Sequence, residues 1–285
     1  MRRLLSHTIT LFKTSRLSRL FGIVWVQIIS ATYLLRIPLS DLISLKFFIL
    51  LVATAMTAGA GYIINDYYDR KIDLINRPEG VIVGISFRPR RALATHFFLN
   101  LLAVGLGVYI SNLIALLIFI FAFSLWFYSN YLRRLVLVGN VLVALMHAGI
   151  MVLITIYFEE TNNLIWIYTL FAFLIVLIKE VVKDLSGVKG YANFGVETIP
   201  VKWGIRGAKM TIYIFSILAI GALTFFLMSG VNLAALYYFI CLFPLFGWFL
   251  YKCNMADTQS EYRYLYKVIN WIMLSGVISI FLLYE

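Results

Sequence analysis

The sequence predicts an all-α membrane protein in which nine transmembrane helices form a single bundle. Its mean hydropathy is +0.93, only 13% of its residues are charged, and long stretches carry no charge. Because soluble domains contain about 25% charged residues, this composition excludes a soluble globule. Membrane-spanning helices need about 20 mostly apolar residues each. Nine stretches qualify: residues 19–36, 43–64, 92–110, 113–132, 135–157, 164–182, 208–229, 232–251 and 265–284.

Basic residues predict how these spans are oriented, because cytoplasmic loops retain positive charge. With the N-terminus inside, all but Arg36 and Lys46 of the 24 Lys and Arg residues fall on the cytoplasmic side. The basic stretch before the first span lacks a small-residue cleavage site, so we expect it to lie on the inner membrane surface. We expect a multi-pass protein of the cytoplasmic membrane. The net charge of +11 follows largely from this topology, and we expect no nucleic-acid partner.

Two polar stretches interrupt the apolar pattern, at residues 65–91 and 183–209. They follow the second and sixth spans, both on the predicted cytoplasmic side. A separation of four spans indicates two related halves, as in many membrane folds. No stretch has the composition of an interdomain linker, so residues 1–285 are expected to form a single domain.

The first polar stretch opens with NDYYDRKID, which contains three of the 13 acidic residues of the chain. Asp66, Asp69 and Asp73 have helical i, i+3, i+7 spacing and would share one face, and Asn65 would join them. Carboxylate and amide oxygens are hard ligands that suit Mg²⁺, and substrate phosphates commonly complete its octahedron. The alternative is a solvated helix end whose acids pair with the neighbouring Arg70, Lys71 and Arg77.

The second polar stretch, KDLSGVKGY, repeats this acidic spacing only in part. From Asp184, the same spacing arrives at Gly187 and Tyr191, so one acid of three is kept. Glu180 precedes this stretch and can pair with Lys183 at i+3. We favour a structural role for Glu180 over a catalytic one.

Acids and bases on one side of the membrane predict a metal–diphosphate site at the mouth of an apolar cavity. Arginine forks suit phosphate oxygens, and basic residues accompany both polar stretches. A diphosphate held at the surface with an apolar remainder in the bilayer describes a polyprenyl diphosphate. When diphosphate leaves an allylic carbon, the negative charge that develops on its bridging oxygen is stabilised by cations. The allylic cation can then alkylate an acceptor.

At this point the residues resemble a known family. NDYYDRKIDLINRP is similar to the first motif of the UbiA superfamily of intramembrane prenyltransferases, N-D-x-x-D-x-x-x-D followed by N-R-P. IKEVVKDLSGVKGYANFGVETIPV resembles the second motif of the branch of digeranylgeranylglyceryl phosphate synthases, R-E-x-x-K-D-x-x-D-x-x-x-D. Lys179 stands in place of the Arg, and Gly187 and Tyr191 replace the last two acids.

The resemblance implies transfer of a polyprenyl group, such as geranylgeranyl, from its diphosphate to a lipid acceptor, a glycerophosphate ether ahead of an aromatic quinone precursor. It also implies a pair of Mg²⁺ ions between the two motifs. Because the second motif is incomplete, three outcomes stay open. The protein could bind one Mg²⁺, with Lys183 or Lys189 replacing the charge of the second ion, it could be a slow or altered enzyme, or it could be a non-catalytic prenyl-lipid-binding protein. The predicted metal ligands are Asn65, Asp66, Asp69 and Asp73, the predicted catalytic residues are Asp69, Asp73 and Asp184, and the predicted diphosphate ligands are Arg77, Tyr128, Arg133, Arg134 and Lys183.

Overall fold

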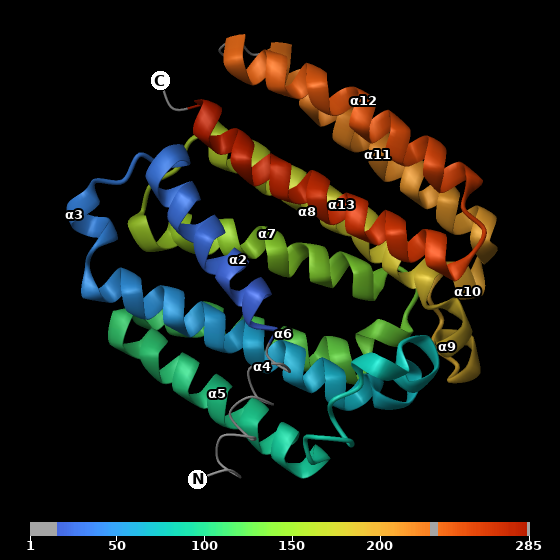
Figure 1. Ribbon diagram of the computed structural model, residues 1–285. Coiled ribbons are helices and arrows are strands. Elements are labelled where there is room, and N and C mark those ends of the chain that lie inside the picture. The colour runs from blue at the N-terminus through green and yellow to red at the C-terminus, as the bar shows by residue number, and fades with distance from the viewer. Residues whose placement is uncertain (1–15, 229–232, 284–285) are drawn as a thin grey trace. The chain divides into compact units, whose positions relative to one another are not determined.

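A computed structural model describes residues 16–228 and 233–283 of the chain, and its regular elements there are helices (Figure 1). Eight of these helices are long and apolar enough to cross a membrane, so the chain is a multi-pass membrane protein. A further helix, α12 (Leu233–Met255), lies at the eighth expected stretch. The count of nine spans and the side of the N-terminus remain predictions. The predicted surface segment before residue 16 lies outside the described residues.

The described chain divides into two compact units. Unit 1 runs as far as Ile28 and continues over Pro38–Arg133, and unit 2 comprises Ile29–Ile37 and the residues from Arg134 onward. Each unit holds one of the two polar stretches. Whether they form a single domain remains a prediction.

The helices of unit 1 meet around α4. Its elements are α2 (Leu17–Ile29), α3 (Leu39–Leu42), α4 (Leu45–Asn76), the 3₁₀ turn Pro78–Gly80, α5 (Pro89–Ile110) and α6 (Asn112–Asn130). Helices α4, α5 and α6 pack against one another and run side by side in Figure 1. A short 3₁₀ turn, Leu132–Arg134, follows α6.

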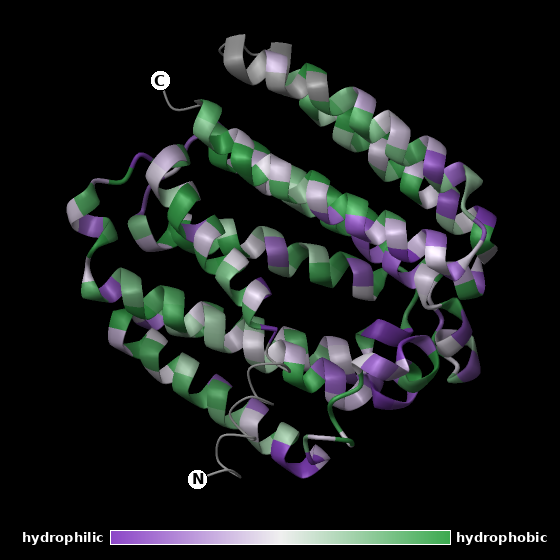
Figure 2. Ribbon diagram, in the orientation of Figure 1, coloured by the Kyte–Doolittle hydropathy of each residue, from purple (hydrophilic) through white to green (hydrophobic). Residues whose placement is uncertain are grey.

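Helix α4 carries an apolar span and continues without a break through NDYYDRKID, the start of the first polar stretch. The Ser44 hydroxyl caps its first turn by accepting a hydrogen bond from the Phe47 amide at 3.3 Å. At 32 residues the helix is about 48 Å long, which exceeds the about 30 Å hydrocarbon core of a bilayer. The sequence placed the end of this span at residue 64. The helix continues to Asn76, and its hydrophilic end is visible in Figure 2.

The connection from α4 to α5 folds back onto α4. Val83 and Phe87 pair as an isolated bridge and are buried with Ile63 and Ala92. Gly84 has a φ of +94°, and a Cβ there would lie 2.5 Å from the Arg70 side chain. This left-handed turn therefore requires glycine, and the folded connection covers the helix face just before the acidic motif.

Unit 2 is built around α8 (Asn163–Ser186), which packs mainly against α7 (Val138–Phe158), α11 (Gly204–Met228) and α13 (Gln259–Ser279). The side chain of Asn162 caps α8 by accepting from the Ile165 amide at 3.0 Å. The remaining elements are the π-helical turn Ser30–Leu34, α9 (Val188–Asn193), α10 (Ile199–Lys202), α12 and the 3₁₀ turn Ile280–Leu283.

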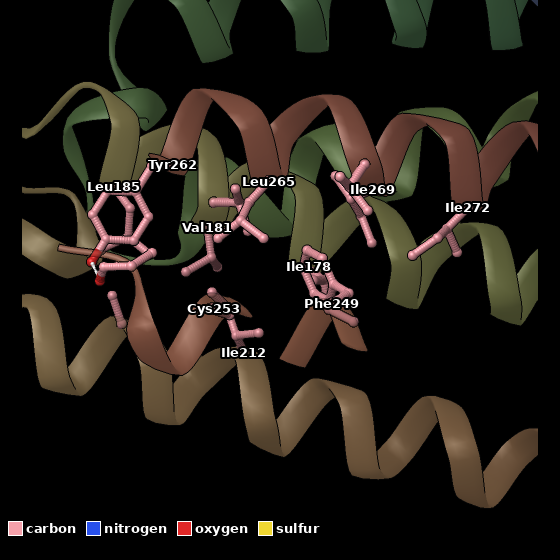
Figure 3. Close-up of a cluster of buried hydrophobic side chains, with 14 of the residues drawn as sticks. Ile178, Val181, Leu185, Ile212, Phe249, Cys253, Tyr262, Leu265, Ile269 and Ile272 are labelled. Carbon is pink, nitrogen blue, oxygen red and sulfur yellow. Dashed lines mark hydrogen bonds between the residues drawn. The ribbon is translucent and has the colours of Figure 1, made fainter. Parts of the chain in front are cut away.

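A large buried cluster of unit 2 joins α8, α11, α12 and α13 among the described residues. Ile178 of α8, Ile212 of α11, Phe249 of α12 and Ile269 of α13 are all fully buried. Figure 3 shows these side chains directed toward one another. At the end of the cluster the Tyr262 hydroxyl donates to the Ala256 carbonyl at 2.7 Å. Packing of this kind holds α8, and with it the second polar stretch, in a defined orientation.

The close approach of α5 and α6 at Gly107 leads to a prediction about stability. A Cβ at Gly107 would lie 2.8 Å from the Ala115 Cα, whereas a Cβ at Gly105 meets open space. Overpacking costs about 1–3 kcal/mol, and removing a helical glycine gains about 1 kcal/mol. Gly107→Ala should therefore lower the thermal unfolding midpoint in detergent, and Gly105→Ala should leave it unchanged or raise it. Equal midpoints for the two variants would contradict the close approach.

Candidate active site

The most buried carboxylate of unit 1 is Asp69, on the polar end of α4, at 2% exposure. It accepts a hydrogen bond from the Asn65 amide nitrogen at 2.6 Å and forms an ion pair with Arg133, which follows α6. The Arg133 guanidinium also donates to the Asn65 amide oxygen at 3.2 Å. The three side chains form a closed triangle in which each contacts the other two. Burial makes this pairing necessary, because an uncompensated buried charge is costly.

The other two acids of the motif each have an arginine of their own. Arg16, immediately before α2, donates to Asp66 at 2.8 Å. Arg77, at the end of α4, donates to both oxygens of Asp73 at 3.1 and 3.2 Å. Of the pairings in the alternative of a solvated helix end, the structure therefore contains the one between Arg77 and Asp73, and the role of Arg77 as a diphosphate ligand stays a prediction. Figure 2 shows hydrophilic residues gathered at this end of α4.

Arg16 stands out because its cationic side chain is largely buried. Its guanidinium lies 5.2 Å from the centre of the Tyr62 ring, within the range of a cation–π contact. Burial lowers the pKa of Arg16, and the Asp66 carboxylate opposes this shift, while the charges of Arg19 and Arg77 add to the lowering. Arginine nevertheless stays protonated in proteins. The guanidiniums of Arg19 and Arg77 therefore lie close enough to act on that of Arg16 at this end of α4.

The predicted metal ligands share α4, but each of the three carboxylates is paired with an arginine. In the part of the chain that the structure describes, no group of three His, Cys, Asp or Glu side chains converges as a metal cluster. The donor chemistry still fits Mg²⁺, since Asn65, Asp66, Asp69 and Asp73 offer hard oxygen atoms from one helix and Mg²⁺ takes only one or two carboxylates beside substrate phosphates. Arginine side chains that release these oxygens would then be available to phosphate.

The predicted diphosphate ligands lie in different surroundings. Arg77 and Arg133 belong to the acid–arginine cluster described above. Tyr128 is buried in the last turn of α6, and Arg134 is exposed. Lys183 lies on α8, where it pairs with Glu180 at 2.5 Å.

Unit 2 contains a second buried polar cluster on α8. Asp184 is 7% exposed and accepts a hydrogen bond from the Asn140 amide of α7 at 2.8 Å. Lys179 and Glu180 are equally buried, and the Glu180–Lys183 pair confirms the predicted i, i+3 contact. His147 of α7 is close enough to interact electrostatically with these charges. A membrane helix that carries so many ionisable groups is a functional candidate by default.

Gly187 and Tyr191, where the family pattern has acids, do not continue the α8 face. The helix ends at Ser186, and Gly187 lies between α8 and the short α9 with a φ of −115°. Tyr191 is on α9, and its side chain is 4% exposed. The second stretch therefore differs from the first, in which one continuous helix carries all three acids.

Sequence reasoning missed two polar residues of these clusters. Arg16 lies 50 positions from Asp66, and in the sequence it is one of several basic residues before the first span. Asn140 lies 44 positions from Asp184 in an otherwise apolar stretch. Its position inside a predicted span was a usable signal, because amides within a span seek hydrogen-bond partners.

Comparisons with known proteins give the family and the fold. Residues 23–274 match the UbiA prenyltransferase family. The chain is 26% identical to digeranylgeranylglyceryl phosphate synthase of Methanosphaera stadtmanae over 93% of both chains. It is 32% identical to the Sulfolobus acidocaldarius protein of that name over 78% of this chain and 81% of the relative. With the Korarchaeum cryptofilum protein of that name, the chain spans about half of the relative's length, 56%, at 31% identity.

Solved structures show the same fold. A structure of digeranylgeranylglyceryl phosphate synthase superposes with a TM-score of 0.72 at 18% identity over 99% of both chains. A UbiA homologue from Archaeoglobus fulgidus bound to DMAPP and Mg²⁺ superposes with a TM-score of 0.64 at 14% identity, over 95% of this chain and 99% of that one.

The Asn65–Asp69–Arg133 triangle predicts a contrast between two adjacent arginines. Arg133→Met removes the counter-charge of a buried carboxylate, which typically costs about 3–5 kcal/mol. Arg134→Met changes an exposed side chain, where substitutions stay within about 0.5 kcal/mol. Thermal unfolding in detergent without substrate should show a much lower midpoint for the first variant only. Similar midpoints would contradict the buried pair.

Proposed function

This chain belongs to the UbiA prenyltransferase family, and we propose that it transfers a polyprenyl group from an allylic prenyl diphosphate to the hydroxyl of a glycerophosphate ether. The observation that carries this proposal is the Asn65–Asp69–Arg133 triangle at the polar end of an apolar membrane helix. Relatives named digeranylgeranylglyceryl phosphate synthase support the acceptor class.

The acid–arginine cluster suits the charge that this reaction develops. The bond between the allylic carbon and the diphosphate oxygen breaks, and negative charge accumulates on the departing diphosphate. Arg133 and Arg77 would donate hydrogen bonds to the oxygens of the diphosphate. These hydrogen bonds strengthen as the negative charge on the diphosphate grows. The acceptor oxygen then bonds to the allylic carbon and loses its proton.

The motif would also hold a metal beside these arginines. Asn65, Asp66, Asp69 and Asp73 would hold Mg²⁺, which when bound neutralises charge on the leaving diphosphate. The oxygen donors of α4 fit that role, and a UbiA homologue of the same fold is bound to DMAPP and Mg²⁺. The other proposed diphosphate ligands are Lys183, Tyr128 and Arg134. The proposed catalytic residues are Asp69, Asp73 and Asp184.

The proposal includes a location. Nine spans with a cytoplasmic N-terminus would place both polar stretches at the cytoplasmic side of the cell membrane. The distribution of basic residues supports this orientation, since only Arg36 and Lys46 fall on the other side. Membrane lipids would then surround the apolar helix faces.

Asp69 provides the first test of this function. With Mg²⁺, geranylgeranyl diphosphate and a geranylgeranylglyceryl phosphate acceptor, the purified protein should release diphosphate and form the diether product. Asp69→Asn should lower the rate by about 100-fold or more, a typical cost for losing one transition-state charge contact. Asp41→Asn, at an exposed aspartate of α3, should retain the wild-type rate. Turnover that is unchanged in Asp69→Asn would refute the metal and charge assignment.

A second candidate function is a prenyl-lipid-binding protein without turnover, and the missing acids of the second motif favour it. Gly187→Asp tests whether the lost acid limits activity, because the φ of −115° at this residue is open to any amino acid. Tyr191 is less suitable, since a carboxylate in its buried position would cost stability.

For the enzyme, Gly187→Asp should lower the Mg²⁺ concentration at half-maximal rate by about tenfold, or about 1.4 kcal/mol. The isosteric Gly187→Asn should not. Equal Mg²⁺ concentrations at half-maximal rate for the two variants would show that the missing carboxylate at position 187 does not limit the enzyme. Binding of prenyl diphosphate with no turnover in the wild type or in Gly187→Asp, across glycerophosphate and aromatic acceptors, would identify the protein as a binding protein.

A further inference from the structure

Arg16 is the least expected member of the acid–arginine cluster. It precedes α2, yet its guanidinium contacts the first acid of the α4 motif, with side chains that are only 22% and 12% exposed for Arg16 and Asp66. Its carbonyl accepts hydrogen bonds from the amides of Arg19 and Leu20 at 2.8 and 3.4 Å. The start of the first span is therefore built on the same residue that neutralises Asp66.

The backbone and the ring beside it hold Arg16 in this place. Its φ is +54°, in the left-handed region that a residue other than glycine seldom adopts. The guanidinium also stacks over Tyr62, one helical turn before Asp66 on α4. A conformation of this kind persists where the surrounding contacts determine it. The backbone conformation of Arg16 and the contact of its guanidinium with the Tyr62 ring thus both support its contact with Asp66.

The three arginines differ in what else they contact. Arg77 directly follows the helix that carries Asp73, and Arg133 contacts Asn65 in addition to Asp69. Arg16 binds one oxygen of one acid, at 2.8 Å. Its guanidinium competes with a cation for that oxygen, and the same guanidinium attracts a phosphate anion. Arg16 should therefore oppose the binding of metal alone and favour the binding of metal together with diphosphate.

We propose that Arg16 is a further substrate-binding residue, which pairs with Asp66 in the metal-free protein and turns to the diphosphate when metal and prenyl diphosphate bind together. The acid at the membrane edge then has a counter-charge in both states, which a carboxylate in such surroundings requires. Rotation of the long arginine side chain suffices, and the backbone of α4 need not move. This inference rests on the proposed function, because the anion is the prenyl diphosphate.

Two binding measurements on detergent-purified protein test the exchange without turnover. Mn²⁺ alone, followed by electron paramagnetic resonance and displaced by Mg²⁺, should bind about tenfold more tightly to Arg16→Gln than to the wild type. Geranylgeranyl diphosphate, measured by calorimetry at saturating Mg²⁺, should bind about tenfold more weakly. Each change corresponds to about 1.4 kcal/mol.

Arg19→Gln is the matched control. Arg19 also lies over the Tyr62 ring, at 5.7 Å, and the contacts of the described residues place only Arg16 on Asp66. Its two affinities should stay within about twofold of the wild type. Arg16→Lys retains the charge without the fork, so it should keep the weak metal binding and lose part of the diphosphate affinity. This variant serves if Arg16→Gln fails to fold, as judged by its thermal midpoint.

Opposite shifts of the two affinities support the exchange, and every other result overturns it. Weakening of both would mean that Arg16 only maintains the structure, and no change in either would mean that it is dispensable. Tighter metal binding with unchanged diphosphate affinity would leave Arg16 as a competing counter-ion that never reaches the substrate. Wild-type protein that fails to bind prenyl diphosphate with Mg²⁺ would instead refute the proposed function, and that failure is visible without any variant.

Discussion

The neutralisation of carboxylates at the end of an apolar helix is the interaction on which this structure depends. Asp66, Asp69 and Asp73 follow a long apolar run on α4, where an uncompensated charge is costly. Each has an arginine partner, and the three arginines come from the segment before α2, the turn after α6 and the position that directly follows α4. The distribution of partners ties three parts of unit 1 to one end of one helix.

Because α4 extends beyond the apolar span, the neutralised acids lie on a helix and not on a loop. A helix that stopped at the apolar boundary would leave the motif on a connection, whereas the observed helix carries it beyond the span with its backbone hydrogen bonds intact. The connection to α5 then folds back, with Val83 and Phe87 buried against Ile63. The motif therefore lies on a rigid helix, and the connection to α5 packs against that helix. A binding site requires such support to hold its charged groups in place.

The second polar stretch follows a different plan. Helix α8 buries Asp184 against Asn140 and pairs Glu180 with Lys183, but it ends at Ser186 before the positions of the missing acids. Tyr191 is buried on α9. The substitution of acids by glycine and tyrosine is thus accompanied by a change of local structure. Two lysines, Lys179 and Lys183, accompany the two carboxylates of α8. A lysine neutralises phosphate charge but cannot bridge it as a metal does.

The sequence alone determined the membrane class, the approximate place of eight candidate spans, the family and the residues of the first motif, because hydropathy and spacing along one helix are local properties. It also identified the Glu180–Lys183 contact, which lies within α8, whereas it offered the pairing of Arg77 with the acids only as part of the alternative of a solvated helix end. Only the tertiary structure decided that α4 continues to Asn76, that Arg16 and Arg133 rather than Arg70 or Lys71 neutralise Asp66 and Asp69, and that Asn140 binds Asp184. These partners are separated by dozens of residues, and many basic residues of the sequence had equal claim to them. Their choice depends on how the helices pack, which no local pattern encodes.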